Sequence, residues 1–209
     1  MARVTSTRDQ IVEGAFAALL TEGLPNLSYD RIAQAAGTSR QLVRYHFKDP
    51  DALMLALCDR MAQAYREALV SSVANLAPGL SRLDVFFDFY FDLVEGRQKP
   101  RDDQVYDALM SRAAASDRIR SALRGQNSLL GKVVANEVRL AHPSLSPEQA
   151  GEISYLFVSL MYGHWRMVAS LGVSSSHNRL SRRAIDRLIK SYLDDGGDAG
   201  ITPWGFEAD

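Results

Sequence analysis

Apolar residues recur along this chain at intervals of three and four residues, the spacing that places them on one face of an α-helix. The first helix is predicted over 7–22, because its apolar pairs repeat until the segment Gly23-Leu24-Pro25-Asn26 interrupts them. No segment alternates apolar and polar residues as a half-buried strand would. The pattern therefore predicts an all-α fold of about nine helices.

Capping residues mark two short helices after the first. Ser28 is a suitable N-cap for the second helix, and Gly37 fits the left-handed position at which it ends. Thr38 or Ser39 can cap a third helix, which ends before Lys48-Asp49-Pro50. Two short helices joined by a tight turn form a helix-turn-helix, whose second helix can enter a DNA major groove about 12 Å wide.

A long fourth helix is predicted to begin at Pro50, with Asp49 as its N-cap, and to continue to the break at Pro78-Gly79. About five further helices follow. The eighth begins at the capping box Ser146-Pro147-Glu148-Gln149, and the ninth runs over about 179–193.

Composition narrows the class of protein. With 46% hydrophobic and 23% charged residues, the 209-residue chain lies near the average for soluble globular proteins. A net charge of −1 argues against a non-specific nucleic-acid coat but leaves room for a local basic patch. The single Cys58 suits a reducing cytoplasm, where we expect the protein. The apolar stretch 153–171 contains His164 and Arg166, which favours a buried helix over a membrane span.

Enzymatic chemistry is not indicated by the residue pattern. The four histidines show no metal-ligand spacing, and neither a Gly-rich phosphate loop nor a nucleophile elbow is present. We therefore expect no catalytic residues, no metal and no cofactor. The alternatives to DNA binding are, first, a helical protein-interaction module and, after it, an unrelated all-α enzyme.

The segment from Leu27 to Ser39, with Tyr45-His46-Phe47-Lys48 and Asp51-Ala52-Leu53 after it, resembles the N-terminal signature of the TetR family of transcriptional regulators. The resemblance covers about residues 7–57 and is architectural beyond them. It implies a ligand-responsive regulator, by default a repressor, that binds a pseudo-palindromic operator in double-stranded DNA as a homodimer. The expected parts are a DNA-binding domain (1–50), a ligand-binding and dimerisation domain (51–195) and a flexible tail (196–209).

In this family the third helix reads the major groove, which here corresponds to residues 38–47. Three positions depart from the usual signature: Gln41 replaces a common glycine, Arg44 a common tyrosine, and Pro50 a phosphate-contacting lysine. Arg44 can still grip a phosphate or a guanine edge, and Lys48 can supply the displaced charge.

The candidate DNA contacts lie on the second and third helices. Arg40, Arg44 and Lys48 are spaced by four, so they form a basic stripe if the helix reaches Lys48. Arg40 and Gln41 are the expected base readers, because their side chains match guanine and adenine edges. The full set is Ser28, Thr38, Ser39, Arg40, Gln41, Arg44, Tyr45, His46 and Lys48. On spacing alone, a solvated polar face is an equal alternative.

A second group of basic residues lies on the polar face of the ninth helix. Its members are Arg179, Arg182, Arg183, Arg187 and Lys190. A solvated or acid-paired face is the favoured interpretation, and a rival DNA-binding surface is the alternative.

The family resemblance implies an effector cavity among the fourth to eighth helices. The segment around Phe86 and Tyr90 is aromatic on one side and carries Asp84, Asp88 and Asp92 on the other. His164 lies within an apolar stripe, as a core histidine or as a polar anchor for a ligand. Plain core is the alternative for the whole set. The candidate ligand contacts are Tyr65, Phe86, Tyr90, Met110, Asn127, His164 and Trp165, which suit a small hydrophobic effector.

The eighth helix is apolar on a second side as well, through Tyr155, Val158, Tyr162 and Trp165. A helix that is apolar on two sides must bury both, so we expect homodimerisation through the eighth and ninth helices.

Overall fold

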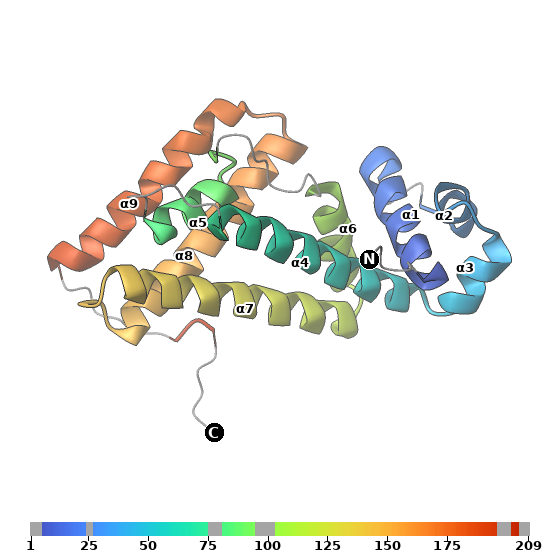
Figure 1. The fold of residues 1–209 in the computed structure, drawn as a ribbon, viewed down its shortest axis with the longest axis horizontal. Coiled ribbons are helices and arrows are strands. Elements are labelled where there is room, and N and C mark those ends of the chain that lie inside the picture. The colour runs from blue at the N-terminus through green and yellow to red at the C-terminus, as the bar shows by residue number, and fades with distance from the viewer. Residues whose placement is uncertain (1–5, 24–26, 75–80, 95–102, 196–201, 205–209) are drawn as a thin grey trace, which may run out of the picture. The chain divides into compact units, whose positions relative to one another are not determined.

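The computed structural model describes residues 6–23, 27–74, 81–94, 103–195 and 202–204 (Figure 1). Within these ranges the chain forms nine α-helices and no strand, which confirms the predicted all-α class. The helices are α1 (Thr7–Glu22), α2 (Tyr29–Ala35), α3 (Arg40–His46), α4 (Pro50–Ala74), α5 (Arg82–Tyr90), α6 (Asp103–Ala113), α7 (Asp117–Ala141), α8 (Pro147–Trp165) and α9 (Asn178–Asp195). None of these helices is both long and apolar enough to cross a membrane.

Side-chain caps explain why several helices begin where they do. At α1, the Ser6 hydroxyl accepts from the Asp9 amide, and the Asp9 carboxylate accepts in return from the Ser6 amide. Ser146 and Gln149 form the same reciprocal pair at α8, as the sequence predicts. The predicted bounds of the first helix and the predicted start of the eighth are confirmed.

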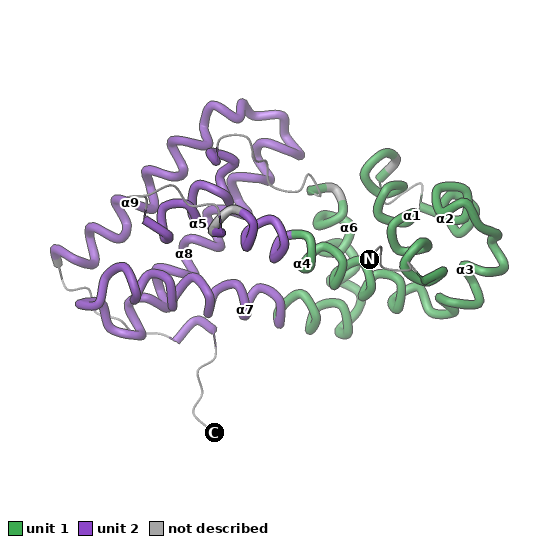
Figure 2. The backbone as a smooth tube through the Cα atoms, in the orientation of Figure 1, with its two compact units in different colours: residues 1–64, 101–124 green, residues 65–100, 125–209 purple. Residues whose placement is uncertain are grey.

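The chain divides into two compact units (Figure 2). Unit 1 comprises residues 1–64 and 101–124, and unit 2 comprises residues 65–100 and 125–209. Helices α4 and α7 each contribute residues to both units.

Unit 1 packs α1 against α2 and α6, and α2 against α3. Fully buried apolar side chains hold it together, among them Ile11, Leu19, Ile32, Val43, Phe47, Leu57 and Ile119. At the first turn of α4, Asp51 accepts hydrogen bonds from the Ser116 hydroxyl and the Arg112 guanidinium. These two hydrogen bonds hold the pKa of Asp51 below its ordinary value, so its charge is maintained where α4 begins.

Unit 2 has an aromatic core. Phe86, Phe87, Phe89, Tyr90 and Phe91 are all buried; Asp88 interrupts this aromatic run and pairs with Arg182 instead. They pack with Phe157 of α8 and with apolar residues of α7 and α9. Helix α5 ends at Tyr90, and Asp92 has a left-handed φ of 56°. The expected continuation of the acidic face to Asp92 is therefore wrong, because the helix stops two residues earlier.

Trp204 is not part of a loose tail. Its indole Nε1–H donates to the Oγ of buried Ser154 at 2.7 Å, and its carbonyl accepts from the Ser128 hydroxyl at 3.4 Å. The glycine at position 131 makes room for the ring, since a Cβ built there would lie 2.0 Å from it. Residues 196–201 and 205–209 of the expected tail lie outside the described residues.

Candidate functional site

The turn between α2 and α3 is built as the sequence predicts. The Ser28 hydroxyl caps α2 by accepting from the Arg31 amide, and the Ser39 hydroxyl caps α3 by accepting from the Leu42 amide. Gly37 has a φ of +62°, a left-handed conformation that a side chain would strain. Three local signals thus fix a helix-turn-helix, in which Val43 is fully buried and anchors α3 to the unit.

The predicted DNA contacts lie on α3 and in the segments beside it. The exposed members are Ser28, Ser39, Arg40, Gln41, Arg44, Tyr45 and Lys48, while Thr38 and His46 are half-buried. Tyr45 keeps 69% of its surface exposed, and its ring meets the His46 ring edge-on at 5.3 Å. The first turn of α3 has no acidic residue, so this surface is locally basic within a nearly neutral chain.

Lys48 does not lie on the face of α3. The helix ends at His46, and Phe47 has φ −129° and ψ 73°, which are not helical angles. Phe47 is 1% exposed and its carbonyl accepts from the Tyr29 hydroxyl at 2.9 Å, so burial of the ring turns the chain inward. The helix thus ends before Lys48, as predicted, and the condition for a stripe of three cations, a helix that reaches Lys48, is not met. Only Arg40 and Arg44 share the helix.

The two arginines of α3 have different surroundings. Arg40 donates through Nη1 to Oδ2 of Asp30 in α2 at 3.1 Å, and both side chains remain more than half exposed. Arg44 forms no ion pair within the part of the chain that the structure describes. One guanidinium is therefore held in place, and the other can adjust to a nearby phosphate.

The rival basic group on α9 is partly neutralised by acids. Arg182 is only 10% exposed and binds Asp84 and Asp88 of α5, at 2.6 and 2.8 Å, as well as Asp186. Lys190 pairs with Asp194 at 2.6 Å. These contacts favour the acid-paired interpretation of this face over a second DNA-binding surface.

The candidate effector residues of unit 2 form a closely packed aromatic cluster. The Tyr65 and Tyr90 rings are stacked, with centroids 6.0 Å apart, and Phe86 lies 5.2 Å from Tyr90. Trp165 donates from Nε1 to the Tyr90 carbonyl at 2.8 Å. Phe86 and Tyr90 are buried, and burial raises the pKa of the Tyr90 hydroxyl above its ordinary value.

The polar candidates in unit 2 already have partners. His164 is buried, and its two ring nitrogens lie 2.8 Å from Asn178 Oδ1 and 3.1 Å from Ser181 Oγ. Because a carboxamide oxygen only accepts, Nε2–H donates to Asn178, and the Ser181 hydroxyl is the hydrogen-bond partner of Nδ1. The Asn127 carboxamide oxygen accepts from the Tyr162 hydroxyl at 2.9 Å. The surroundings of His164 match those of a satisfied core histidine.

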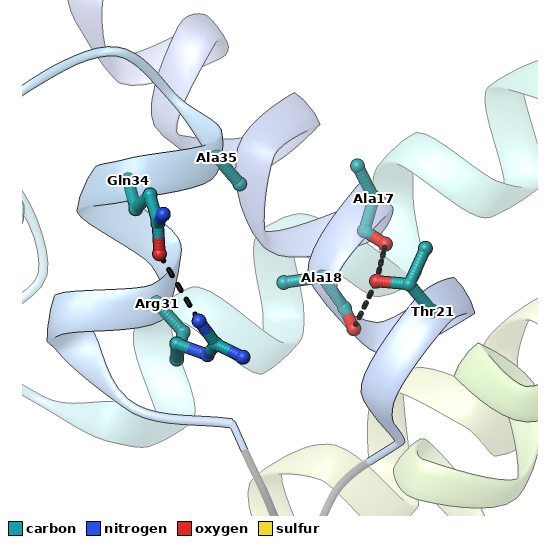
Figure 3. Close-up of a pocket in the computed structure, with 6 residues that line it drawn as sticks. All are labelled: Ala17, Ala18, Thr21, Arg31, Gln34 and Ala35. Atoms are coloured by element: carbon teal, nitrogen blue, oxygen red, sulfur yellow. Dashed lines mark hydrogen bonds between the residues drawn. The ribbon is translucent and has the colours of Figure 1, made fainter.

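Met110 belongs to unit 1, whereas the other candidates belong to unit 2, and it is 44% exposed. Unit 1 also contains a shallow pocket of about 220 Å³ between α1 and α2 (Figure 3). Four of its six lining residues are Ala17, Ala18, Thr21 and Ala35, and the other two, Arg31 and Gln34, hydrogen-bond to each other. This lining offers few groups for a ligand. Among the described residues, no three potential ligands gather as a metal ion would require.

Comparison with known proteins gives a consistent result. Residues 11–57 match the profile of the bacterial regulatory proteins of the tetR family. The transcriptional repressor Rv1474c of Mycobacterium tuberculosis is 30% identical over 146 residues, covering 68% of this chain and 74% of that protein. The transcriptional regulator BetI of Escherichia coli is 25% identical over 171 residues, covering 79% and 83%.

A solved structure has the same fold. A transcriptional regulator from Saccharomonospora viridis, crystallised in complex with choline, is 20% identical and covers 88% of this chain and 95% of its own, with a TM-score of 0.69. The similarity thus extends over both units, although the profile match is confined to α1–α4.

Proposed function

This chain belongs to the TetR family of bacterial regulatory proteins, and we propose that it is a repressor whose affinity for a pseudo-palindromic operator changes when a small effector binds unit 2. Family membership makes it a DNA-binding regulator rather than an enzyme. The observation that carries the proposal is the capped α2–α3 pair with exposed Arg40, Gln41 and Arg44 on its outer side.

Operator recognition divides between two kinds of contact. Arg40 and Gln41 stand at the start of α3, the end of a recognition helix that contacts base edges. Arg44, Tyr45 and Lys48 are the proposed phosphate contacts, which fix register without reading sequence. A homodimer presents two such helices to half-sites about 34 Å apart, which accounts for a pseudo-palindromic operator.

The homodimer is proposed to form through α8 and α9. Large apolar side chains remain exposed on both helices: Tyr155, Leu156, Leu180 and Leu193. An isolated protomer rarely exposes such residues in numbers on adjacent elements, and a second copy would bury them.

The effector is proposed to bind among the rings of Tyr65, Phe86, Tyr90 and Trp165. These side chains favour a small, largely apolar molecule. The faces of stacked tyrosines also attract cations, so a quaternary ammonium group suits this cluster. The choline-bound relative of the same fold supports this choice. Entry requires the side chains of Tyr65 and Trp165, the half-buried members, to move.

Helix α4 is the proposed link between effector and operator. It supplies residues to both units, and its first turn is held by Asp51. The proposal requires two conformations of the protein that differ in operator affinity. An effector that binds one of them more tightly must change operator affinity, and the operator must change effector affinity by the same factor.

The test uses the full-length protein and the DNA that flanks its own gene. Light scattering of the complex should show two chains per operator. Trp165 fluorescence is then followed in a Trp204→Phe variant during titration with choline and with the uncharged alcohol that carries a tert-butyl group in place of the trimethylammonium. Choline should bind about threefold to tenfold more tightly and change operator affinity. No operator binding would refute the function, and equal binding of the two alcohols would refute the cationic effector.

A further inference from the structure

We propose that Asp30 is a specificity-determining residue that holds the Arg40 guanidinium in the orientation needed to read a guanine in each half-site. This inference rests on the proposed function, because it requires α3 to lie in the major groove. It assigns a role to an acidic residue of α2 on a surface otherwise expected to favour cations.

The two residues meet because of the turn between their helices. Ser28 caps α2 and places Asp30 in its first turn, and Ser39 caps α3 and makes Arg40 its first residue. Gly37 reverses the chain between them with its left-handed φ. The Arg40 Nη1 to Asp30 Oδ2 distance of 3.1 Å is thus set by two capped helices and a tight turn.

The contact leaves the reading edge of the guanidinium free. Arginine carries five N–H donors in a planar fork, and Asp30 engages Nη1 alone. Nε and Nη2 have no hydrogen-bond partner among the described residues, and this edge matches the O6 and N7 acceptors of guanine in bidentate geometry. The Arg40 and Asp30 side chains are 56% and 64% exposed, so this free edge is open to an approaching base.

A held arginine and a free arginine have different uses at a DNA surface. Without a partner, a long cationic side chain follows the nearest phosphate and contributes similarly on any sequence. Anchoring by Asp30 reduces this freedom for Arg40, whereas Arg44 has no such partner among the described residues. The carboxylate also adds a negative charge near DNA, so its benefit must appear in selectivity rather than in total affinity.

The experiment measures selectivity. An operator is first selected from random DNA with the wild-type protein, and Arg40→Ala identifies the guanine that Arg40 senses. The ratio of affinities for this operator and for one with that guanine replaced is then compared between wild type and Asp30→Ala. Glu13→Ala is the matched control, because Glu13 is a half-exposed acid of unit 1 that pairs with Arg60 instead.

We expect Asp30→Ala to lower the ratio about threefold to fivefold, the scale of an exposed ion pair, with equal or higher affinity for unrelated DNA. Asp30→Glu should restore part of the ratio, Glu13→Ala should leave it unchanged, and in an Arg40→Ala background the removal of Asp30 should cause no further change in the ratio. An equal change on all DNA with the ratio unaltered, or a change in the ratio that persists without Arg40, would overturn the assignment. Absence of any sequence preference in the wild type would instead overturn the proposed function.

Discussion

On α3 the side chains proposed to touch DNA are exposed, whereas on α5 the side chains proposed to touch the effector are buried among other rings. In unit 1, one set of residues holds the helix in place and another set is proposed to contact DNA. Val43 and Phe47 anchor α3, and Arg40 and Arg44 extend outward. In unit 2 the same aromatic residues form the core and the candidate site.

The difference matters for how each site can change. Exposed residues can be replaced at little cost in stability, so operator preference can be altered without altering the fold. The aromatic cluster lacks this separation, because a change in ring shape alters both packing and effector binding. An effector that enters the cluster must also repack part of the core, which gives it a direct influence on the arrangement of unit 2.

The largest expected effect is on stability, and it appears when a buried ring of the aromatic cluster is compared with an exposed ring of α3. Phe86→Ala should lower the free energy of unfolding by about 3 to 5 kcal/mol, because it removes a ring that is 2% exposed and leaves a cavity. Tyr45→Ala should change it by no more than about 0.5 kcal/mol, since that ring is 69% exposed, while weakening DNA binding. Both values are measured by denaturant unfolding.

Similar stability losses for Phe86→Ala and Tyr45→Ala would remove the contrast between the two sites. A stable Phe86→Ala protein with weakened effector binding would show that the cluster is a preformed pocket rather than core.

Arg44→Ala should have the next largest effect, and on binding only. Removal of a cation with no ion-pair partner in the described chain should cost about 2 kcal/mol of operator binding over the two arms of a dimer. The loss should be similar on unrelated DNA. The slope of log affinity against log salt concentration should fall in magnitude by about one per arm of the dimer. Titrations at several salt concentrations measure both. A loss confined to the operator would make Arg44 a base reader.

Much of unit 1 follows from local sequence signals. Ser28, Gly37, Ser39 and Pro50 each act through neighbours within a few residues, so their effects on helix bounds could be predicted from the chain alone. The end of α3 before Lys48 is also predicted, but the contact that accompanies it is not: the Phe47 carbonyl accepts from the hydroxyl of Tyr29, which is 18 residues away. A basic stripe that includes Lys48 would need a longer helix than this one.

In unit 2, the surroundings of polar and charged residues depend more heavily on contacts between residues that are far apart in the sequence. Arg182 was recognisable as part of a basic group, but its partners Asp84 and Asp88 lie 98 and 94 residues away. The hydrogen bonds of His164 to Asn178 and Ser181 likewise join α8 to α9. Periodicity predicts that such residues lie on a given face, but it does not say which residue of another helix they will meet.

The smallest expected effect tests whether the packed interior of unit 2 includes Trp204. Alanine normally stabilises a helix interior by about 0.5 to 1 kcal/mol relative to glycine. Gly125→Ala of α7 should show this gain, because a Cβ there meets nothing within 4 Å. Gly131 lies in the same helix, but its replacement by alanine would place a Cβ against the Trp204 ring. The free energy of unfolding of Gly131→Ala should therefore be about 1 kcal/mol lower than that of Gly125→Ala.

Fluorescence gives a second measurement. In a Trp165→Phe background, where Trp204 is the remaining tryptophan, Gly131→Ala should also shift the emission to longer wavelength as the indole leaves Ser154. Equal stability of the two alanine variants, with unchanged emission, would show that Trp204 does not occupy this site in solution and that the interior of unit 2 ends at its helices.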